Sequence, residues 1–442
     1  MGAVAIIFFI QLRKQSNGSG LSLAYLINLW LIHWVASAIY ALPWYSNYTL
    51  NDVIAGLEQS TYAVVAFSAG YVLYTFIHGI SSKQLPDEPT SLSEKKYRIS
   101  DAGQTNLYIG IGLICFFLGN SSLANLPSAT SLVTSAANLA VIGLMLKAWL
   151  AWLSGNRLAF WFWALSSSIF PLLTILIQGF IGFGTFSAIM VLTFIARFYR
   201  PRWKLAVMGI AAVYLGLSIY VTYMRDRNDI RETVWGGQSY GARIDQLKTT
   251  FSQFEIFDIN NDKHLELIDL RLNQNALVGA AVNHIDAGRQ EFANGETLID
   301  AVIALIPRFI WPDKGVAAGS GDLVSKFTGF TFPEDTSVGV GQVMEFYINF
   351  GQWGVIIGFM SLGLIIALID NGAGRCLATS DWPNFVCWYL PGMTLLYVGG
   401  SLVEVTAGAA ASLIVAVTIK FLISSYRRSE IDKRVPVLVK SG

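Results

Sequence analysis

Residues 346–369 read FYINFGQWGVIIGFMSLGLIIALI and contain no charged side chain. An α-helix needs about 20 predominantly apolar residues to cross the hydrocarbon core of a membrane. The composition agrees, because 54% of the residues are hydrophobic and only 13% are charged, whereas about 25% are charged in soluble domains. We therefore predict an all-α, polytopic membrane protein with about 10 or 11 transmembrane helices. Similar apolar runs occur at 21–43, 53–80, 105–122, 131–153, 158–177, 180–198, 204–224, 384–402 and 404–424.

The chain is predicted to have three parts. Residues 1–224 form a transmembrane helix bundle, residues 225–345 form a loop domain, and residues 346–442 form the last transmembrane helices and a cytoplasmic tail. The apolar stretch at 3–12 is too short to span a membrane alone, and we treat it as the remnant of an eleventh helix.

Lys and Arg residues indicate which side of the membrane each loop faces. Of the 30 Lys and Arg residues, 11 lie within 225–345, and the remaining 19 lie in or beside every second loop. The intervening loops, such as 44–52 and 123–130, contain none. Because cytoplasmic loops carry the excess of Lys and Arg, we predict a cytoplasmic C-terminus and an extracytoplasmic segment 225–345.

The segment 225–345 differs from the rest of the chain, since it holds 18 of the 29 acidic residues. Its stretches 242–257 and 262–287 have apolar residues at helical spacing, which predicts short amphipathic helices. Residues 296–311 are more apolar, and Pro307 and Pro312 end this stretch. We expect an interfacial helix there, with Trp311 at the depth of the lipid headgroups.

Several classes of function have no support in the sequence. There is no phosphate-binding loop, no zinc-type spacing of His and Glu, and no Asp-x-Asp pair near a membrane edge. The formal net charge is only +1, which argues against a nucleic-acid partner. We therefore expect no cofactor, no metal and no nucleic acid.

Residues that can carry chemistry gather at two motifs and near one helix end. The motifs are residues 307–314, PRFIWPDK, and residues 345–351, EFYINFG. The helix end carries Arg225, Arg227 and Arg231. An arginine fork at a membrane edge pairs with phosphate oxygens, although such residues also bind lipid headgroups or loop carboxylates.

Glu345 is the first candidate for a general base, because a carboxylate near the bilayer surface is costly and often functional. The alternative is a charge that stabilises a helix N-terminus. Glu404 either pairs with a loop arginine or takes part in catalysis. His284 is a further candidate base, and a plain surface histidine is the alternative.

Residues 306–314, IPRFIWPDK, and 345–354, EFYINFGQWG, resemble bacterial oligosaccharide repeat-unit polymerases. These are the Wzy-type O-antigen polymerases, which are related to the O-antigen ligases. The resemblance implies a GT-C-like membrane architecture in the bacterial inner membrane, with the large loop in the periplasm. It also implies glycosyl transfer between undecaprenyl-pyrophosphate-linked oligosaccharides, with membrane lipid and a chain-length regulator protein as further partners.

In the reaction that the resemblance implies, a sugar hydroxyl of one lipid-linked repeat unit attacks the anomeric carbon of the growing chain. Glu345 would accept the hydroxyl proton, and Arg308 would stabilise the leaving pyrophosphate together with Arg225 or Arg231. The ligase relatives use a histidine base in this loop, and His284 is the residue considered for it. Asp313 and Lys314 resemble a structural pair that orients the loop. The predicted substrate-binding residues are Arg225, Arg231, Arg271, Asn275, Trp311, Lys314, Tyr347, Asn349 and Glu404.

Two other functions fit part of this pattern. A ligase would transfer a finished glycan to a lipid core or a protein. A flippase of lipid-linked glycans would also bind pyrophosphate through arginine, but flippases typically show repeated halves and charged residues along a central path. The chain shows no repeated halves, and its apolar runs hold almost no charge.

The predicted topology can be tested with single cysteines introduced after replacement of the three native ones. An impermeant thiol reagent applied to intact spheroplasts should label cysteines within 262–290 and none within 197–204 or 427–434. Labelling of 197–204 from outside would contradict the orientation.

Overall fold

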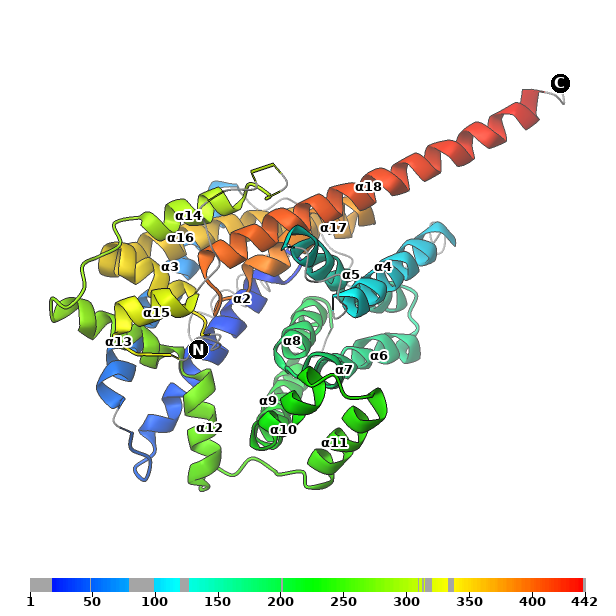
Figure 1. Cartoon of the computed structure of the whole chain (residues 1–442). Coiled ribbons are helices and arrows are strands. Elements are labelled where there is room, and N and C mark those ends of the chain that lie inside the picture. The colour runs from blue at the N-terminus through cyan, green and yellow to red at the C-terminus, as the bar shows by residue number, and fades with distance from the viewer. Residues whose placement is uncertain are drawn as a thin grey trace.

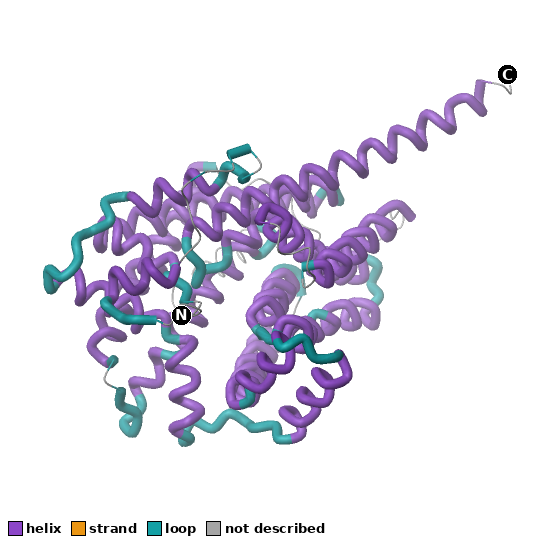
Figure 2. The backbone as a smooth tube through the Cα atoms, in the orientation of Figure 1, coloured by secondary structure: helices purple, strands orange, loops and turns teal. Residues whose placement is uncertain are grey.

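The computed structural model describes residues 18–47, 49–78, 99–119, 127–199, 202–308, 310–311, 314, 320–332 and 338–439. All regular elements within these ranges are helices, which confirms the predicted all-α class (Figures 1 and 2). The apolar stretch predicted at 3–12 and residue Asp313 lie outside the described residues.

The described helices up to residue 225 belong to the predicted transmembrane bundle. They are α2 (Leu21–Trp30), the π-helix η1 (Leu31–Val35), the 3-10 helix η2 (Ser37–Ala41), α3 (Leu50–Ile77), α4 (Ile99–Leu118), α5 (Pro127–Leu153), α6 (Arg157–Ser166), α7 (Ile169–Gln178), α8 (Gly182–Ala196) and α9 (Arg202–Arg225).

Shorter helices follow in the polar segment, and three helices end the chain. They are α10 (Arg227–Trp235), α11 (Tyr240–Ser252), α12 (Asp262–Leu272), α13 (Gln274–Asp286), α14 (Glu296–Ala304), α15 (Ser320–Thr328), α16 (Gln342–Ala378), α17 (Trp382–Leu395) and α18 (Leu402–Val439).

Within the described ranges, six helical stretches are long and apolar enough to cross a membrane, and three shorter apolar helices accompany them. The chain is therefore a multi-pass membrane protein. The six stretches are Leu50–Ile77, Ala129–Leu153, Arg157–Gln178, Val207–Arg225, Gln342–Ala378 and Leu402–Ser425.

Three apolar runs differ from the continuous helices that the sequence predicted. The run 21–43 changes from α-helix to π-helix and then to 3-10 helix. The run 158–177 is divided at Ser167 and Ser168, whose hydroxyls bond to carbonyls of the preceding turn. The run 384–402 is helical only to Leu395, because the backbone after it turns to pair with the start of α16.

Helices α3 and α16 pack most extensively, and glycines make their close approach possible. A Cβ atom at Gly363 would lie 2.2 Å from the carbonyl oxygen of Phe67. A Cβ atom at Gly70 would lie 2.1 Å from the carbonyl oxygen of Met360. Small residues on both helices therefore bring the backbones together, as is typical of membrane helix pairs.

A buried carboxylate near the end of α16 joins it to α2. Asp370 is completely buried, and its oxygens accept hydrogen bonds from the backbone N–H groups of Ser19, Gly20, Leu21 and Ser22. The hydroxyl of Ser19 donates to it as well. Asp370 thus satisfies the free N–H groups at the start of α2, which otherwise have no partner.

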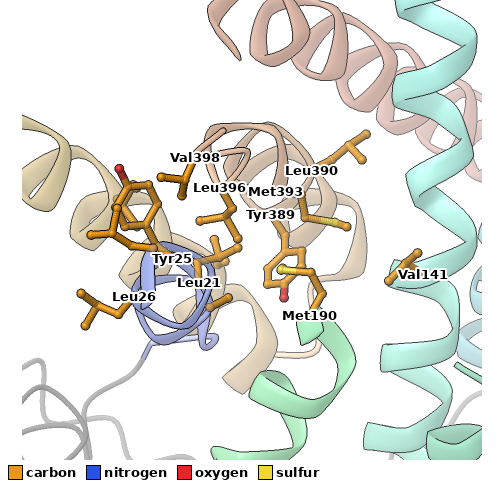
Figure 3. Packing of buried hydrophobic residues seen from close by; sticks show 14 of the residues in the cluster. Leu21, Tyr25, Leu26, Val141, Met190, Tyr389, Leu390, Met393, Leu396 and Val398 are labelled. Carbon is orange, nitrogen blue, oxygen red and sulfur yellow. The ribbon is translucent and has the colours of Figure 1, made fainter. Parts of the chain in front are cut away.

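One hydrophobic cluster contains residues from all three predicted parts of the chain. It includes Val278 of α13 and Phe327 of α15 together with residues of the membrane helices. Figure 3 shows Tyr25 of α2 beside Leu396 and Val398, which follow α17. The polar segment is therefore packed onto the bundle through a shared core.

We expect Gly363→Ala to lower the free energy of unfolding by about 1–3 kcal/mol, because the added methyl group overpacks the α3–α16 contact. The matched control is Gly110→Ala in α4, where a Cβ atom meets nothing within 4 Å. This control should be neutral or should raise the stability by about 0.5–1 kcal/mol. Thermal unfolding of the detergent-solubilised proteins measures both changes, and equal effects of the two substitutions would contradict the close contact.

Candidate functional site

A break near the start of α16 defines the setting of Glu345. Phe350 has φ −142°, and Gly351 has φ 61° and ψ −150°, so the helix is interrupted after Asn349. The positive φ favours glycine, since other residues rarely adopt it. The motif EFYINFG is therefore a short helix that ends in a glycine break, followed by the long span.

Glu345 is the acidic residue of this motif, and only 1% of its surface is exposed. Its Oε2 atom accepts a hydrogen bond of 2.6 Å from the backbone N–H of Leu402, the first residue of α18. Among the described residues, its Oε1 atom is buried without a hydrogen-bond partner. A buried acceptor without a partner is costly, so a further donor would stabilise this oxygen. The Thr297 hydroxyl also acts on the carboxylate.

The charged groups that act on Glu345 are other carboxylates, those of Glu404 and Asp300. Such surroundings favour a hydrogen-bond donor or a cation over an anion. The position of Glu345 at the start of α18 also agrees with the alternative role, a charge at a helix N-terminus. A role at a helix N-terminus does not explain why Oε1 of Glu345 has no hydrogen-bond partner among the described residues.

Asn349 is a structural residue, which corrects its prediction as a substrate contact. It is fully buried, and its Oδ1 atom accepts from the N–H of Gly295. Its Nδ2 atom donates to the hydroxyl of Thr297 and to the carbonyl of Glu345. Because its amide is engaged on both sides, Asn349 fixes the start of α14 beside Glu345.

Glu404 also has a structural role, and its predicted contact with substrate stays a prediction. Its Oε2 atom accepts from the N–H of Ser401, while the Ser401 hydroxyl accepts from the N–H of Glu404. These reciprocal bonds form a capping box at the start of α18. Tyr347 is 6% exposed, and its hydroxyl donates to Asp286, so it too is engaged within the protein.

Lys314 and Arg308 lie at the other end of α14. The Lys314 ammonium group donates to the carbonyls of Ala304 and Ile306, at 3.2 and 2.7 Å, and so caps the helix. Burial lowers the pKa of Lys314, and the positive charge of Arg308 lowers it further. Lys314 therefore has a structural role at the end of α14, while its predicted pairing with Asp313 lies outside the described residues.

Arg308 is half-buried, and Trp311 is 46% exposed. The helix ends at Ala304, earlier than the predicted 296–311. Helix α14 has nine residues, and the rise is 1.5 Å per residue. Its C-terminal end, which precedes Arg308, therefore lies roughly 13 Å from its N-terminal end, which Asn349 contacts. The predicted roles of Arg308 and Trp311 with substrate stay predictions.

His284 lies on α13 against the end of α15. A Cβ atom at Gly329 would lie 2.9 Å from its Cε1 atom, so the imidazole packs against this glycine. The ring is half-buried. Its role as a base stays a prediction.

Arg225 differs from the expectation, because its guanidinium group is fully used inside the protein. It donates five hydrogen bonds, to the Asp226 carboxylate, to Glu255, and to the carbonyls of Thr250 and Gln253. A guanidinium group has five N–H donors, so none is left for a phosphate. Arg225 is therefore removed from the predicted substrate-binding residues.

Asn275 is a further correction. The predicted helical stretch 262–287 is divided in the structure, because α12 ends at Leu272 and α13 begins after Asn273, so Arg271 and Asn275 lie on different helices. Asn275 is fully buried, where it bonds to His33 and Ser37 of the first membrane segment. Arg271 is exposed and stays a predicted substrate contact.

The structure brings together three arginines, and one of them, Arg227, was not among the predicted substrate-binding residues. Arg227 and Arg231 are four residues apart on α10, and Arg271 lies in the last turn of α12. The positive charge of Arg271 acts on both Arg227 and Arg231, and α12 packs beside α9, the helix that precedes α10. The spacing of Arg227 and Arg231 was a readable signal, because positions i and i+4 share a helix face.

Over the described part of the chain, no group of three or more His, Cys, Asp or Glu side chains is arranged to hold a metal ion. Comparison with known proteins gives one match, to the sequence profile described as Domain of unknown function (DUF8712), over residues 36–379. The chain belongs to the DUF8712 family. No curated protein and no solved structure matches it.

The DUF8712 match includes Arg308, Glu345 and the arginine group, but it ends before α18. The N–H of Leu402 that holds Glu345 is therefore outside the matched region. The environment of Glu345 in this DUF8712 protein depends on both the matched region and the helix beyond it.

The Arg225 network of the DUF8712 protein predicts a pH-dependent stability. Hydrogen bonds from Arg225 lower the pKa of Asp226 and Glu255, and His264 also lowers that of Glu255. This stabilisation is fully present above the ordinary carboxyl pKa and is lost as the pH falls through the lowered values. Arg225→Ala should therefore melt at a lower temperature than the wild type at neutral pH.

The difference in melting temperature should narrow as the pH falls. The control is Arg289→Ala, which removes an exposed arginine of the same segment. A constant difference across the acidic range would show that Arg225 acts through packing and not through its ion pairs.

Proposed function

We propose that the protein is a Wzy-type polymerase that joins undecaprenyl-pyrophosphate-linked oligosaccharide repeat units into a polysaccharide. The observation that carries the proposal is the free Oε1 atom of Glu345, a buried acceptor in the motif that resembles this family. The multi-pass architecture supports it, because a lipid-linked substrate must be met at a membrane.

The proposed reaction forms one glycosidic bond and breaks the bond to the pyrophosphate. The acceptor hydroxyl gives its proton to Oε1 of Glu345 while its oxygen attacks the anomeric carbon of the donor. The bond between that carbon and the pyrophosphate oxygen breaks, and the pyrophosphate leaves with the electron pair. Arg308 stabilises its negative charge by a bidentate pair of hydrogen bonds, so the proposed transfer is metal-independent.

The surroundings of Glu345 suit a base. The Leu402 N–H holds Oε2 of Glu345, and the Asn349 side chain donates to the backbone carbonyl of Glu345. Helix α14 connects this place to the segment with Arg308, and Lys314 fixes its far end. The threonine hydroxyl of α18, from Thr406, holds the middle of α14 by donating to the Ala301 carbonyl. A positioned base and a cation for the leaving group are the two parts that the transfer requires.

The proposal includes the location of the site. We place the protein in the bacterial inner membrane in a GT-C-like architecture, with the segment 225–345 on the outer, periplasmic side. The distribution of Lys and Arg supports this orientation. The undecaprenyl-pyrophosphate-linked oligosaccharides, membrane lipid and a chain-length regulator protein are the proposed partners.

The base is tested with Glu345→Gln, which keeps the shape and loses proton acceptance. We expect the polymerisation rate to fall about 10²–10⁴-fold while lipid-linked substrate still binds. The measurement is the ladder of chain lengths on gels at matched protein level. Glu404→Gln and His284→Ala are run beside it, and loss of product in either one together with a normal ladder in Glu345→Gln would move the base to that residue.

The cation is tested with Arg308→Lys and Arg308→Ala. Lysine keeps the charge but lacks the planar fork, so both variants should be damaged to nearly the same extent. Arg289→Ala, an exposed arginine of the same segment, is the matched control and should give a normal ladder. A wild-type ladder from Arg308→Lys would show that only a positive charge is needed.

A further inference from the structure

The group of Arg227, Arg231 and Arg271 lies apart from the Glu345 site. Figure 1 shows α10 and α14 well separated, and α10 packs in a different hydrophobic cluster from α14. Burial lowers the pKa of Arg227 and of Arg231, and the positive charge of a neighbouring arginine lowers each further. The three cations therefore repel one another in the present arrangement.

No described carboxylate forms an ion pair with any of the three arginines. Among the described residues, the Nε atom of Arg231 and the hydroxyl of Tyr220, which lies in α9 seven residues before Arg227, are buried without hydrogen-bond partners. Arg225, close by in the sequence, has all five donors engaged. The Tyr223 hydroxyl is a hydrogen-bond partner of Arg227 and Arg231. A repelling group without a carboxylate partner is stabilised by an anion, and arginine forks match phosphate oxygens.

Arg231 is held in place before any ligand binds. The guanidinium group of Arg231 lies 4.3 Å from the ring centre of Phe180 and 4.9 Å from that of Trp235. The Trp235 Nε1–H donates to the carbonyl of Gln178 and fixes that ring. An open cavity of about 460 Å³ adjoins these two aromatic rings, with Tyr240 among its lining residues. A preorganised site binds with a smaller entropic cost.

The helix that leads to this group suits a lipid chain. Helix α9 contains the least buried of the six membrane-spanning stretches, Val207–Arg225. Exposed apolar side chains such as Ile210 and Leu215 run along it. It ends two residues before Arg227. A lipid that lies along α9 would therefore present its headgroup to the arginines.

We propose that Arg227, Arg231 and Arg271 bind the diphosphate of the second lipid-linked substrate, the acceptor. This inference rests on the proposed function, in which two lipid diphosphates take part in each transfer. The attacking hydroxyl is at the opposite end of the acceptor repeat unit from its own diphosphate. The acceptor diphosphate must therefore bind away from Glu345, and Arg308 serves only the leaving diphosphate of the donor.

The test measures binding of farnesyl diphosphate to the purified full chain in nanodiscs of neutral lipid. The wild type should bind two equivalents, and Arg308→Ala should bind one. In the Arg308→Ala background, Arg231→Ala or Arg271→Ala should weaken the remaining site by at least about 10-fold, because charge-assisted hydrogen bonds are lost. Arg289→Ala in the same background should bind like its parent. Arg271 is exposed, so its substitution should leave the fold intact if Arg231→Ala proves unstable.

Two further probes separate the sources of the phosphate. Inorganic pyrophosphate should bind more weakly than farnesyl diphosphate, and nanodiscs with phosphatidylglycerol should compete poorly. Equal competition by phosphatidylglycerol would make the group a general site for anionic lipid and overturn the proposal. Unchanged affinity in both Arg231→Ala and Arg271→Ala would overturn it as well.

Activity separates this inference from the proposed function. Arg271→Ala should raise the KM for the acceptor with little change in kcat, whereas Glu345→Gln should lower kcat and keep both binding sites. If the wild-type protein forms no polymer but the arginine group binds the diphosphate, the polymerase proposal fails and the diphosphate site stands. An active polymerase in which Arg271→Ala leaves the acceptor KM unchanged would remove the acceptor assignment alone.

Discussion

Two buried carboxylates on α16 hold this structure together, because each one receives the start of another helix. Asp370, near one end, accepts five hydrogen bonds from the residues that begin α2. Glu345, near the other end, accepts one from the start of α18. A carboxylate in an apolar interior is tolerated only when its oxygens are bonded, and helix N-termini supply the donors. Asp370 is completely satisfied and serves the fold. Glu345 keeps one oxygen free, and this difference separates a structural carboxylate from one that is available for chemistry.

The apolar runs predicted the helical, membrane-spanning character of the chain, because length and hydrophobicity suffice to identify a span. The roles of the polar residues near the site were harder to predict. Asn349 and Asn275 were taken as substrate contacts from their neighbours in the sequence, yet each bonds to a segment more than 50 residues away. Such partners depend on tertiary packing. The role of Glu404 was readable, since Ser401 and Glu404 have the spacing of a capping box.

The arginines show where spacing is informative and where it is not. Arg227 and Arg231 have the four-residue spacing of one helix face, so their proximity follows from a helix alone. Arg225 belongs to the preceding helix, and its carboxylate partner Glu255 lies 30 residues later, which no local pattern reveals. Arg271 joins Arg227 and Arg231 only because α12 packs beside the end of α9. The proximity of Arg227 and Arg231 can therefore be predicted from the sequence, whereas the position of Arg271 beside them depends on the fold.

The break after Asn349 separates the short helix with Glu345 from the long span that follows it. The carbonyl of Ile348 and the amide of Asn349 bond to residues 293–297 and not to the span. A membrane helix adjusts its tilt to the thickness of the bilayer around it. With a rigid helix, such tilting would swing Glu345 away from the start of α18. A joint at Gly351 would let the span follow a thinner or thicker bilayer while the carboxylate stays beside the start of α18.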